Sequence, residues 1–148
     1  MLEEGRRLLT DDLSGRINIV RQDFFEPQSR REDDTAAAYL LRQCTHNWCD
    51  PDVVTMFRCL VPGLESSGLG TPLLINDIVM HEPGQRWPRL LERDIRQIDM
   101  IMLICFSGKQ RTRAEFEALL KEADARYEIE NVYATGPMGL LEVYLRQG

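Results

Sequence analysis

The stretch YLLRQCTHNWCDPD, residues 39–52, joins the end of one predicted element to the start of the next. The apolar run over 36–41 predicts a strand that is buried on both faces of a sheet. Asp50 and Pro51 predict the N-cap and the first position of a helix. Because ligands bind at the carboxyl ends of strands in open α/β sheets, His46 in the intervening polar loop is a candidate acid or base. The alternative at this point is a solvated loop histidine with no chemical role.

Predicted strands and helices alternate along the chain. The run over 73–80 is the strongest predicted strand, and 88–106 is the longest predicted helix, with apolar side chains at helical spacing. This alternation favours one α/β domain over residues 1–148, with a mostly parallel sheet, flanking helices and an antiparallel C-terminal hairpin. The other predicted elements are a helix at 2–9, a strand at 17–20, a helix from 50 that Pro62 should kink or end early, a loop at 66–70, a helix from 112 with a capping box to Glu115, a strand at 127–134, a turn at Gly136–Pro137 and a strand at 140–145.

Composition and charge limit the class of protein. Of the 148 residues, 43% are hydrophobic and 28% are charged, and the net charge is −6. These values fit an ordinary soluble globular protein and argue against a nucleic-acid partner. No apolar run is long enough to span a bilayer, and the charged N-terminus resembles neither a signal nor a transit peptide, so we expect a cytoplasmic protein with no membrane partner. The 4 cysteines form no CxxC pair, so we expect reduced, mostly buried thiols and no metal site.

Five segments carry a family resemblance: RINIVRQDFFEP (16–27), AYLLRQCTHNWCDPD (38–52), PLLINDIVMHEPG (72–84), RDIRQIDMIML (93–103) and SGKQRTRAEFEALLKEA (107–123). Together they resemble the C-terminal part of the S-adenosylmethionine-dependent O-methyltransferases of plant and fungal specialised metabolism, and the fungal branch more closely. The resemblance extends over essentially the whole chain. It implies a partial Rossmann-like methyltransferase sheet. The implied family activity is methyl transfer from S-adenosylmethionine to a hydroxyl of a small aromatic or polyketide substrate.

The resemblance implies a role for three residues of the catalytic centre. His46 matches the general base, which deprotonates the substrate hydroxyl so that its oxygen attacks the methyl carbon of the cofactor; imidazole suits this role. Asp77 matches one of two acidic residues that orient the base. Gln110, in the motif Gly108–Thr112, stands where the second carboxylate is expected. It can hydrogen-bond the base, but it cannot stabilise an imidazolium by charge.

The resemblance also implies contacts for the cofactor and the substrate. Asp23 matches the acidic residue that binds the adenine amino group, Phe24 follows at a second adenine contact, and Arg42 matches a basic residue near the cofactor. For Asp23 the alternative is a solvated carboxylate at a strand end. The residues predicted to line the substrate site are Trp48, Met80, Met102, Phe106 and Lys109, with Met100 and Trp87 as further candidates. For the methionines the alternative is core filling.

The family's glycine-rich cofactor loop and N-terminal dimerisation domain have no counterpart in this sequence. We therefore expect a truncated methyltransferase-like domain that binds S-adenosylmethionine weakly or not at all. The family fold predicts the strand order 36–41, 73–80, 140–145, 127–134, which leaves 36–41 as an apolar edge. Either 17–20 pairs with that edge or a second chain covers it, so we expect a homo-oligomer or a partner chain.

Three functions stay open on this reasoning. The first is an O-methyltransferase acting on a phenolic or polyketide hydroxyl. The second is a cofactor-independent pericyclase or cyclase on a polyketide-derived substrate, for which His46, Lys109 and Gln110 would serve. The third is an inactive truncated paralogue that acts as a binding or scaffold module. The pairing of His46 with Asp77 favours the two enzymes, whereas the exposed strand edge favours the third function.

Overall fold

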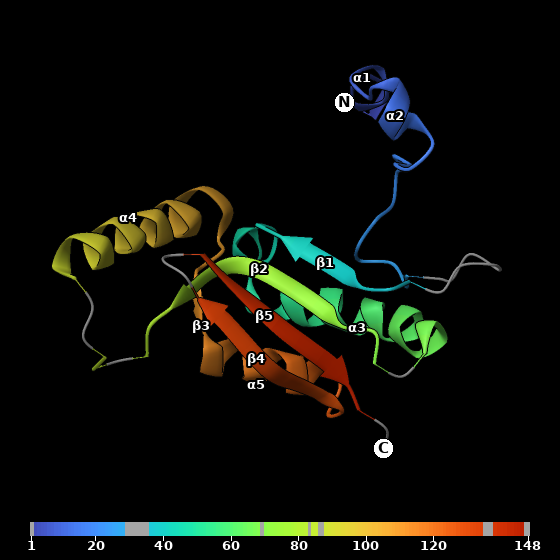
Figure 1. The fold of residues 1–148 in the computed structure, drawn as a ribbon. Helices are drawn as coiled ribbons and strands as arrows, with labels where there is room; N and C mark the ends of the chain where they lie inside the picture. Colours follow the sequence, from blue (N-terminus) through green and yellow to red (C-terminus); the bar gives the residue numbers. More distant parts are fainter. Residues whose placement is uncertain are drawn as a thin grey trace.

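The computed structural model describes residues 2–28, 36–68, 70–82, 84–85, 88–134 and 138–146. Its elements are α1 (Leu2–Arg7), α2 (Asp11–Ser14), β1 (Tyr39–Arg42), the 3-10 helix η1 (Thr45–Asn47), α3 (Asp50–Ser67), β2 (Leu73–Met80), α4 (Arg89–Phe106), β3 (Arg111–Thr112), α5 (Arg113–Ala123), β4 (Tyr127–Ala134) and β5 (Met138–Leu145). In Figure 1, α3 and α5 lie on one side of the sheet, α4 lies at one end, and α1 and α2 lie away from it. Trp87 and the predicted turn at Gly136–Pro137 fall outside the described residues.

The sheet is mixed and has the strand order β1–β2–β5–β4. β1 runs parallel to β2, whereas β5 runs antiparallel to both β2 and β4. The short strand β3 pairs in parallel with the end of β2, at Val79 and Met80. The predicted α/β class and strand order are thereby confirmed, and β5 brings antiparallel pairing on both of its sides.

One face of the sheet is buried under α3 and α5. In α3, Val53, Phe57 and Leu60 recur every three or four positions, so one side of the helix packs on the sheet. In β2, Leu73 and Ile75 point to that same face because side chains alternate along a strand. Each large apolar side chain that is fully buried contributes about 1.5–3 kcal/mol. This core fixes β2 and therefore the polar residues near its carboxyl end.

Both ends of α3 differ from the prediction. Cys49 occupies the N-cap, and Asp50 and Pro51 are the first two residues of the helix, so Asp50 is not the capping residue. The helix also passes through Pro62 and continues to Ser67. Of the two effects predicted for Pro62, a kink or an early end, the early end does not occur. Proline removes one backbone hydrogen bond, but the apolar positions on either side of it still pack on the core and hold the helix together.

Residues 17–20 do not form the predicted strand. They pair with no strand in the described part of the chain, and Ile17 and Val20 are 44% and 46% exposed. A strand is stabilised by hydrogen bonds to a neighbouring strand. β1 is the edge strand of the sheet and pairs with β2 alone, so the expected pairing of 17–20 with β1 is absent. β1 is also shorter than the predicted run 36–41. Leu40 is 59% exposed, so the strand is not buried on both faces. Pairing of this edge with a second chain stays a prediction.

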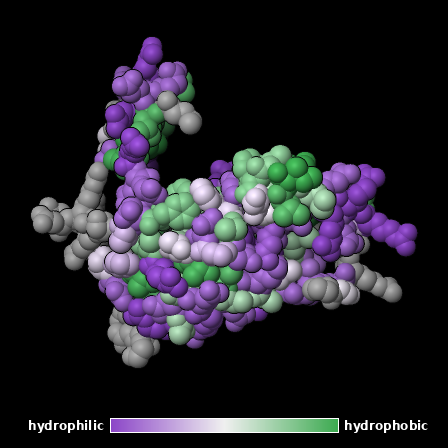
Figure 2. Space-filling view, turned by 180° about the vertical axis from the view of Figure 1, so that it is seen from behind, coloured by the Kyte–Doolittle hydropathy of each residue, from purple (hydrophilic) through white to green (hydrophobic). Residues whose placement is uncertain are grey.

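α4 carries an apolar surface that the other described elements leave largely uncovered. Figure 2 shows hydrophobic side chains gathered over this helix. Of its residues only Ile95 is buried, in a small apolar cluster with Ile78 and Met80. The apolar stripe predicted for this helix is mostly uncovered: Leu91 and Met102 are half-buried, and Ile98, Ile101 and Cys105 are exposed. No described helix is long and apolar enough to cross a membrane.

Candidate functional site

A hydrogen-bonded pair of His46, in the loop that follows β1, and Asp77, in the C-terminal half of β2, lies just beyond the end of β1. The parallel register pairs Arg42 with Asn76, so the loop that follows β1 begins beside the Asp77 position. His46 Nδ1 lies 2.5 Å from Asp77 Oδ1. The hydroxyl of Thr45 donates to Asp77 Oδ2 at 2.6 Å. The structure thus brings together two residues that are 31 positions apart in the sequence.

The geometry of this pair selects one tautomer of the imidazole. The Asp77 side chain is 1% exposed and also accepts the backbone N–H of Ile78 at 3.0 Å, so its oxygens are acceptors that face donors. His46 Nδ1 must therefore carry the proton that it shares with Asp77. His46 Nε2 then has a lone pair, and it makes no hydrogen bond to any described residue. An imidazole held in this way can accept a proton at Nε2.

Residues 43–49, which join β1 to α3 and carry His46, are called here the histidine loop. The guanidinium of Arg111, a side chain with 0% exposure, holds this loop by its backbone. Its Nη1 donates to the carbonyl oxygen of Thr45 at 2.9 Å, and its Nη2 donates to that of Trp48 at 2.8 Å. Nε and Nη2 also donate to Asp50 Oδ1, at 3.0 and 2.7 Å. Five N–H groups in a fixed plane suit such a set of acceptors.

A charge cluster extends this contact to the start of α5. Lys109 Nζ lies 3.1 Å from Asp50 Oδ2 and 2.9 Å from Glu115 Oε1. Burial raises the pKa of Asp50, but hydrogen bonds from Arg111 and Lys109 outweigh it and hold the pKa below its ordinary value. For Lys109, burial lowers the pKa, but its two carboxylate partners outweigh this effect and hold the pKa above its ordinary value. Glu115 and Thr112 form the predicted capping box of α5, which is confirmed.

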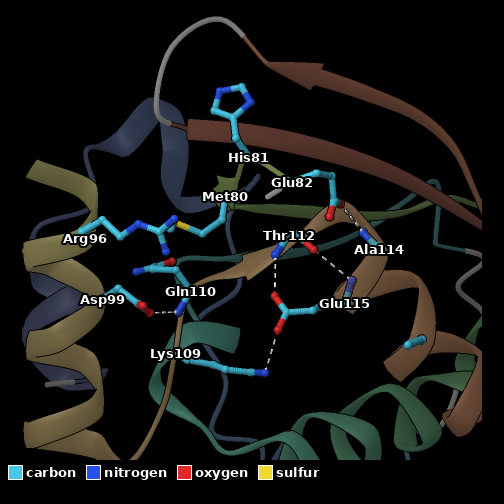
Figure 3. A pocket seen from close by; sticks show the side chains of 11 residues that line it. Met80, His81, Glu82, Arg96, Asp99, Lys109, Gln110, Thr112, Ala114 and Glu115 are labelled. Atoms are coloured by element: carbon cyan, nitrogen blue, oxygen red, sulfur yellow. Dashed lines mark hydrogen bonds and ion pairs between the residues drawn. The ribbon is translucent and has the colours of Figure 1, made fainter. Parts of the chain in front are cut away.

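A cavity of about 550 Å³ lies beside this cluster, between α4, the end of β2 and the start of α5 (Figure 3). Asp99 Oδ1 accepts the backbone N–H of Gln110 at 2.6 Å and ties α4 to the cavity floor. The Gln110 side chain is 4% exposed, and neither its oxygen nor its nitrogen has a hydrogen-bond partner in the described structure. Arg96 extends from α4 toward Gln110 and Met80 across the cavity (Figure 3).

The predicted substrate residues divide into two groups. Met80 and Lys109 line the cavity with Gln110, whereas His46 does not line it. Met102, Phe106 and Trp48 lie outside its lining as well. Phe106 is 55% exposed at the end of α4. Trp48 instead packs edge-on against Phe24, with the ring centroids 5.5 Å apart, and against Phe25.

The predicted cofactor residues do not line this cavity. Asp23 is exposed, and its Oδ1 accepts the backbone N–H of Phe25 at 2.9 Å. The half-buried ring of Phe24 is next to Trp48, and Arg42 is exposed at the end of β1. Across the described residues, no group of three or more His, Cys, Asp or Glu side chains is placed to hold a metal ion.

Thr45, Arg111 and Asp99 belong to the site, but the sequence did not single them out. Their roles depend on partners that are 32, 66 and 11 positions away. The one available signal was an arginine between a glycine-containing loop and a helix N-cap, where a surface charge is the ordinary interpretation.

The cysteines Cys44, Cys49 and Cys59 are half-buried and Cys105 is exposed, all four as free thiols, so the prediction of mostly buried thiols is wrong.

Known proteins resemble the chain in both sequence and structure. Residues 1–126 match the model of an O-methyltransferase domain. O-methyltransferase sol2 of Alternaria solani is 54% identical over 145 residues, which cover 98% of this chain and 33% of that relative. The mitomycin 7-O-methyltransferase MmcR has a TM-score of 0.77 at 28% identity, over 98% of this chain and 39% of MmcR. NcsB1, an O-methyltransferase from neocarzinostatin biosynthesis solved with S-adenosyl-L-homocysteine and 1,4-dihydroxy-2-naphthoic acid, has a TM-score of 0.72 at 25% identity, over 97% of this chain and 38% of NcsB1. The chain spans about a third of the length of the curated relatives it matches: 33% of sol2 and 32% of O-methyltransferase AMT9 of Alternaria alternata.

Proposed function

The chain belongs to the O-methyltransferase family, and from this premise we propose that it carries the base of a methyl transfer to a hydroxyl group of a small aromatic or polyketide-derived compound. His46 is that base, and Asp77 orients it. The observation that carries this proposal is the 2.5 Å contact between His46 Nδ1 and Asp77 Oδ1, which leaves Nε2 as the proton acceptor. Gln110, which the family resemblance put beside the base, makes no hydrogen bond to this pair.

In this proposal the chain moves one proton. The substrate hydroxyl donates to His46 Nε2 and loses its proton there, while Asp77 stabilises the positive charge that develops on the ring. Thr45 and the backbone N–H of Ile78 hold the Asp77 carboxylate, so the ring keeps its orientation while it changes charge. The deprotonated oxygen is a stronger nucleophile than the hydroxyl.

S-adenosylmethionine is the cofactor that this family uses, and when bound it supplies an electrophilic methyl group. The exposed carboxylate of Asp23 and the ring of Phe24 would hold the adenine end, with Arg42 nearby. The other end of the cofactor finds no such fit in the described chain. Gly108 lies next to the histidine loop, but a Cβ there would meet the backbone of Asn47 at 2.8 Å, so its surface faces protein and not a ligand.

A hydroxylated aromatic acid is the substrate class that we propose to test first. NcsB1 was solved with 1,4-dihydroxy-2-naphthoic acid, which presents a phenolic hydroxyl beside a carboxylate. In this chain the cavity offers the Arg96 guanidinium and the Gln110 amide, and the acidic side chains of Glu82, Asp99 and Glu115 line it as well. Lys109 is already paired with Asp50 and Glu115, so we propose that Arg96 contacts the carboxylate of such a substrate and the Gln110 amide its neighbouring hydroxyl.

Because binding of S-adenosylmethionine is expected to be weak, the experiment supplies the purified chain with a large excess of labelled S-adenosylmethionine and with 1,4-dihydroxy-2-naphthoic acid and follows the methylated product. We expect His46→Gln to lower the rate by about 10²–10⁴-fold, the usual contribution of a general base. Tyr133→Phe is the control, because Tyr133 is exposed on β4, does not line the cavity and should leave the rate unchanged. Equal rates for the wild type and His46→Gln would contradict the proposal. So would binding of both compounds, seen by calorimetry, without any product.

A second candidate function is a cofactor-independent cyclisation. The observation that favours it is the unpaired amide of Gln110 at the floor of the cavity beside Lys109, since hydrogen-bond donors in a shaped pocket are what such a reaction needs. Consumption of a polyketide-derived substrate in the absence of S-adenosylmethionine, and its loss in Gln110→Leu, would distinguish this function from methyl transfer.

A further inference from the structure

We propose that Arg111 is the positioning residue of this site, because its guanidinium fixes the backbone of the histidine loop and thereby keeps His46 in contact with Asp77. This inference rests on the proposed function only for what His46 does to a substrate. The role of Arg111 concerns the orientation of the imidazole, which exists in the chain without cofactor or substrate.

The carbonyl groups that Arg111 contacts flank the histidine on both sides. Thr45 O accepts from Nη1 at 2.9 Å, and Trp48 O accepts from Nη2 at 2.8 Å. Thr45 begins the 3-10 helix that carries His46, and Trp48 is its C-cap. The guanidinium therefore spans the ends of a single short turn. A third carbonyl, that of Lys109, accepts from Nη1 at 3.2 Å.

The guanidinium is itself held in place by the sheet and by a carboxylate. β3 pairs with β2 so that Arg111 lies opposite Val79, two positions after Asp77. Asp77, which contacts the imidazole, and Arg111, which contacts its loop, thus lie on neighbouring strands. Asp50 accepts two further N–H groups of the guanidinium at 3.0 and 2.7 Å and is its charged partner in the described chain.

A lysine at this position cannot reproduce the arrangement. Its ammonium group offers donors from one point, whereas the acceptors of Arg111 lie around a plane. With one of the loop carbonyls released, the turn is free to shift, and the hydrogen bond between His46 Nδ1 and Asp77 Oδ1 is lost once a shift of about 1 Å separates the two atoms beyond hydrogen-bond distance. The imidazole then loses the acceptor that selects its tautomer.

The test is a long-range ¹⁵N–¹H spectrum of the histidine rings in the labelled chain, recorded without ligands. The chain has 2 histidines, and His81→Gln identifies which signals belong to His46. In the wild type we expect Nδ1 of His46 to be protonated and Nε2 not. In Arg111→Lys we expect the ratio of the Nδ1–H to the Nε2–H tautomer to fall by about tenfold or more, since a hydrogen bond to a charged group is lost.

Two matched variants separate positioning from general stability. Lys109→Gln removes the neighbouring cation, which contacts Asp50 and Glu115 through its side chain but no carbonyl of the loop, and should leave the tautomer ratio unchanged. Tyr127→Phe removes a buried hydrogen bond to the carbonyl of Phe57 at 2.8 Å, in the core, and should lower stability with the same ratio as the wild type.

An unchanged tautomer ratio in folded Arg111→Lys would overturn the proposal, as would an equal loss in Tyr127→Phe. If Arg111→Lys does not fold, Asp50→Asn becomes the test, because it removes the charged partner of the guanidinium at a position that is 41% exposed. Broadening or loss of the His46 Nδ1–H signal in that variant would support the proposal, and a sharp, unshifted signal would overturn it. The test measures the tautomer of His46 and not turnover. Its outcome can therefore be interpreted even if His46 turns out not to be the general base.

Discussion

Gly108→Ala adds a single methyl group between the cavity motif and the histidine loop. A Cβ at this position would lie 2.8 Å from Asn47 C and 3.0 Å from His46 C, and it would overlap His46 O. Carbon atoms in contact are normally about 3.5–4.0 Å apart, so the two segments must separate by roughly 0.5–1 Å. The loop is held by Arg111 and cannot yield easily. Overpacking typically costs about 1–3 kcal/mol, and we expect the upper part of this range.

Urea unfolding followed by tryptophan fluorescence measures this free-energy change. Gly15→Ala is the matched control, because no atom lies within 4 Å of its Cβ position and its φ of −86° is open to alanine. We expect the control to stay within about 0.5 kcal/mol of the wild type. The histidine ring spectrum of Gly108→Ala should also show loss of the Nδ1–H signal. A variant as stable as Gly15→Ala, with that signal intact, would refute the argument that the loop is tightly held.

Three other changes test the packing and the charges. Ile95→Ala should cost about 2–3 kcal/mol, the low end of the range for a buried isoleucine, whereas the exposed Ile101→Ala should change the urea midpoint little. Thr112→Ala should remove the cap of α5 and cost about 1 kcal/mol in the same assay. Because the folded pKa of Asp50 is lowered, its contribution is complete above the usual carboxylate pKa of about 3.9 and is lost as the pH falls through the lower folded value. Asp50→Asn should therefore destabilise the chain at pH 7 and much less in strong acid, and an equal destabilisation at both would argue against the ion pairs.

Local patterns predicted the elements whose cause is local. The apolar run of β2 gives a strand with its predicted bounds, Leu73–Met80, because its side chains pack on both sides of the sheet. The capping box of α5 was predictable for the same reason, since Thr112 and Glu115 satisfy each other. The contact of His46 with Asp77 was implied by the family resemblance and not by spacing, and their role as a catalytic pair stays a prediction.

The errors fall where a segment depends on a distant partner. Residues 17–20 have the apolar alternation of a strand, but the described chain offers them no neighbouring strand. α4 has an apolar stripe, but burial of a stripe requires a surface to receive it, and only Ile95 finds one. Arg111 was missed because a buried guanidinium is defined by its acceptors, which come from the loop and from Asp50.

Because α4 has few buried contacts, we expect the wall of the cavity that it forms to be less rigid than the rest. Arg96 and Asp99 stand on this helix and line the cavity, while Ile95 anchors its N-terminal half and the Asp99 contact with the Gln110 backbone anchors its C-terminal half. Segments with few buried contacts open at low free energy, well below global unfolding. Amide hydrogens of α4 should therefore exchange with solvent far sooner than those of β2 or α3. We expect the volume of the cavity to vary with the tilt of α4, which Leu91, Ile95 and the Asp99 contact hold against the rest of the chain.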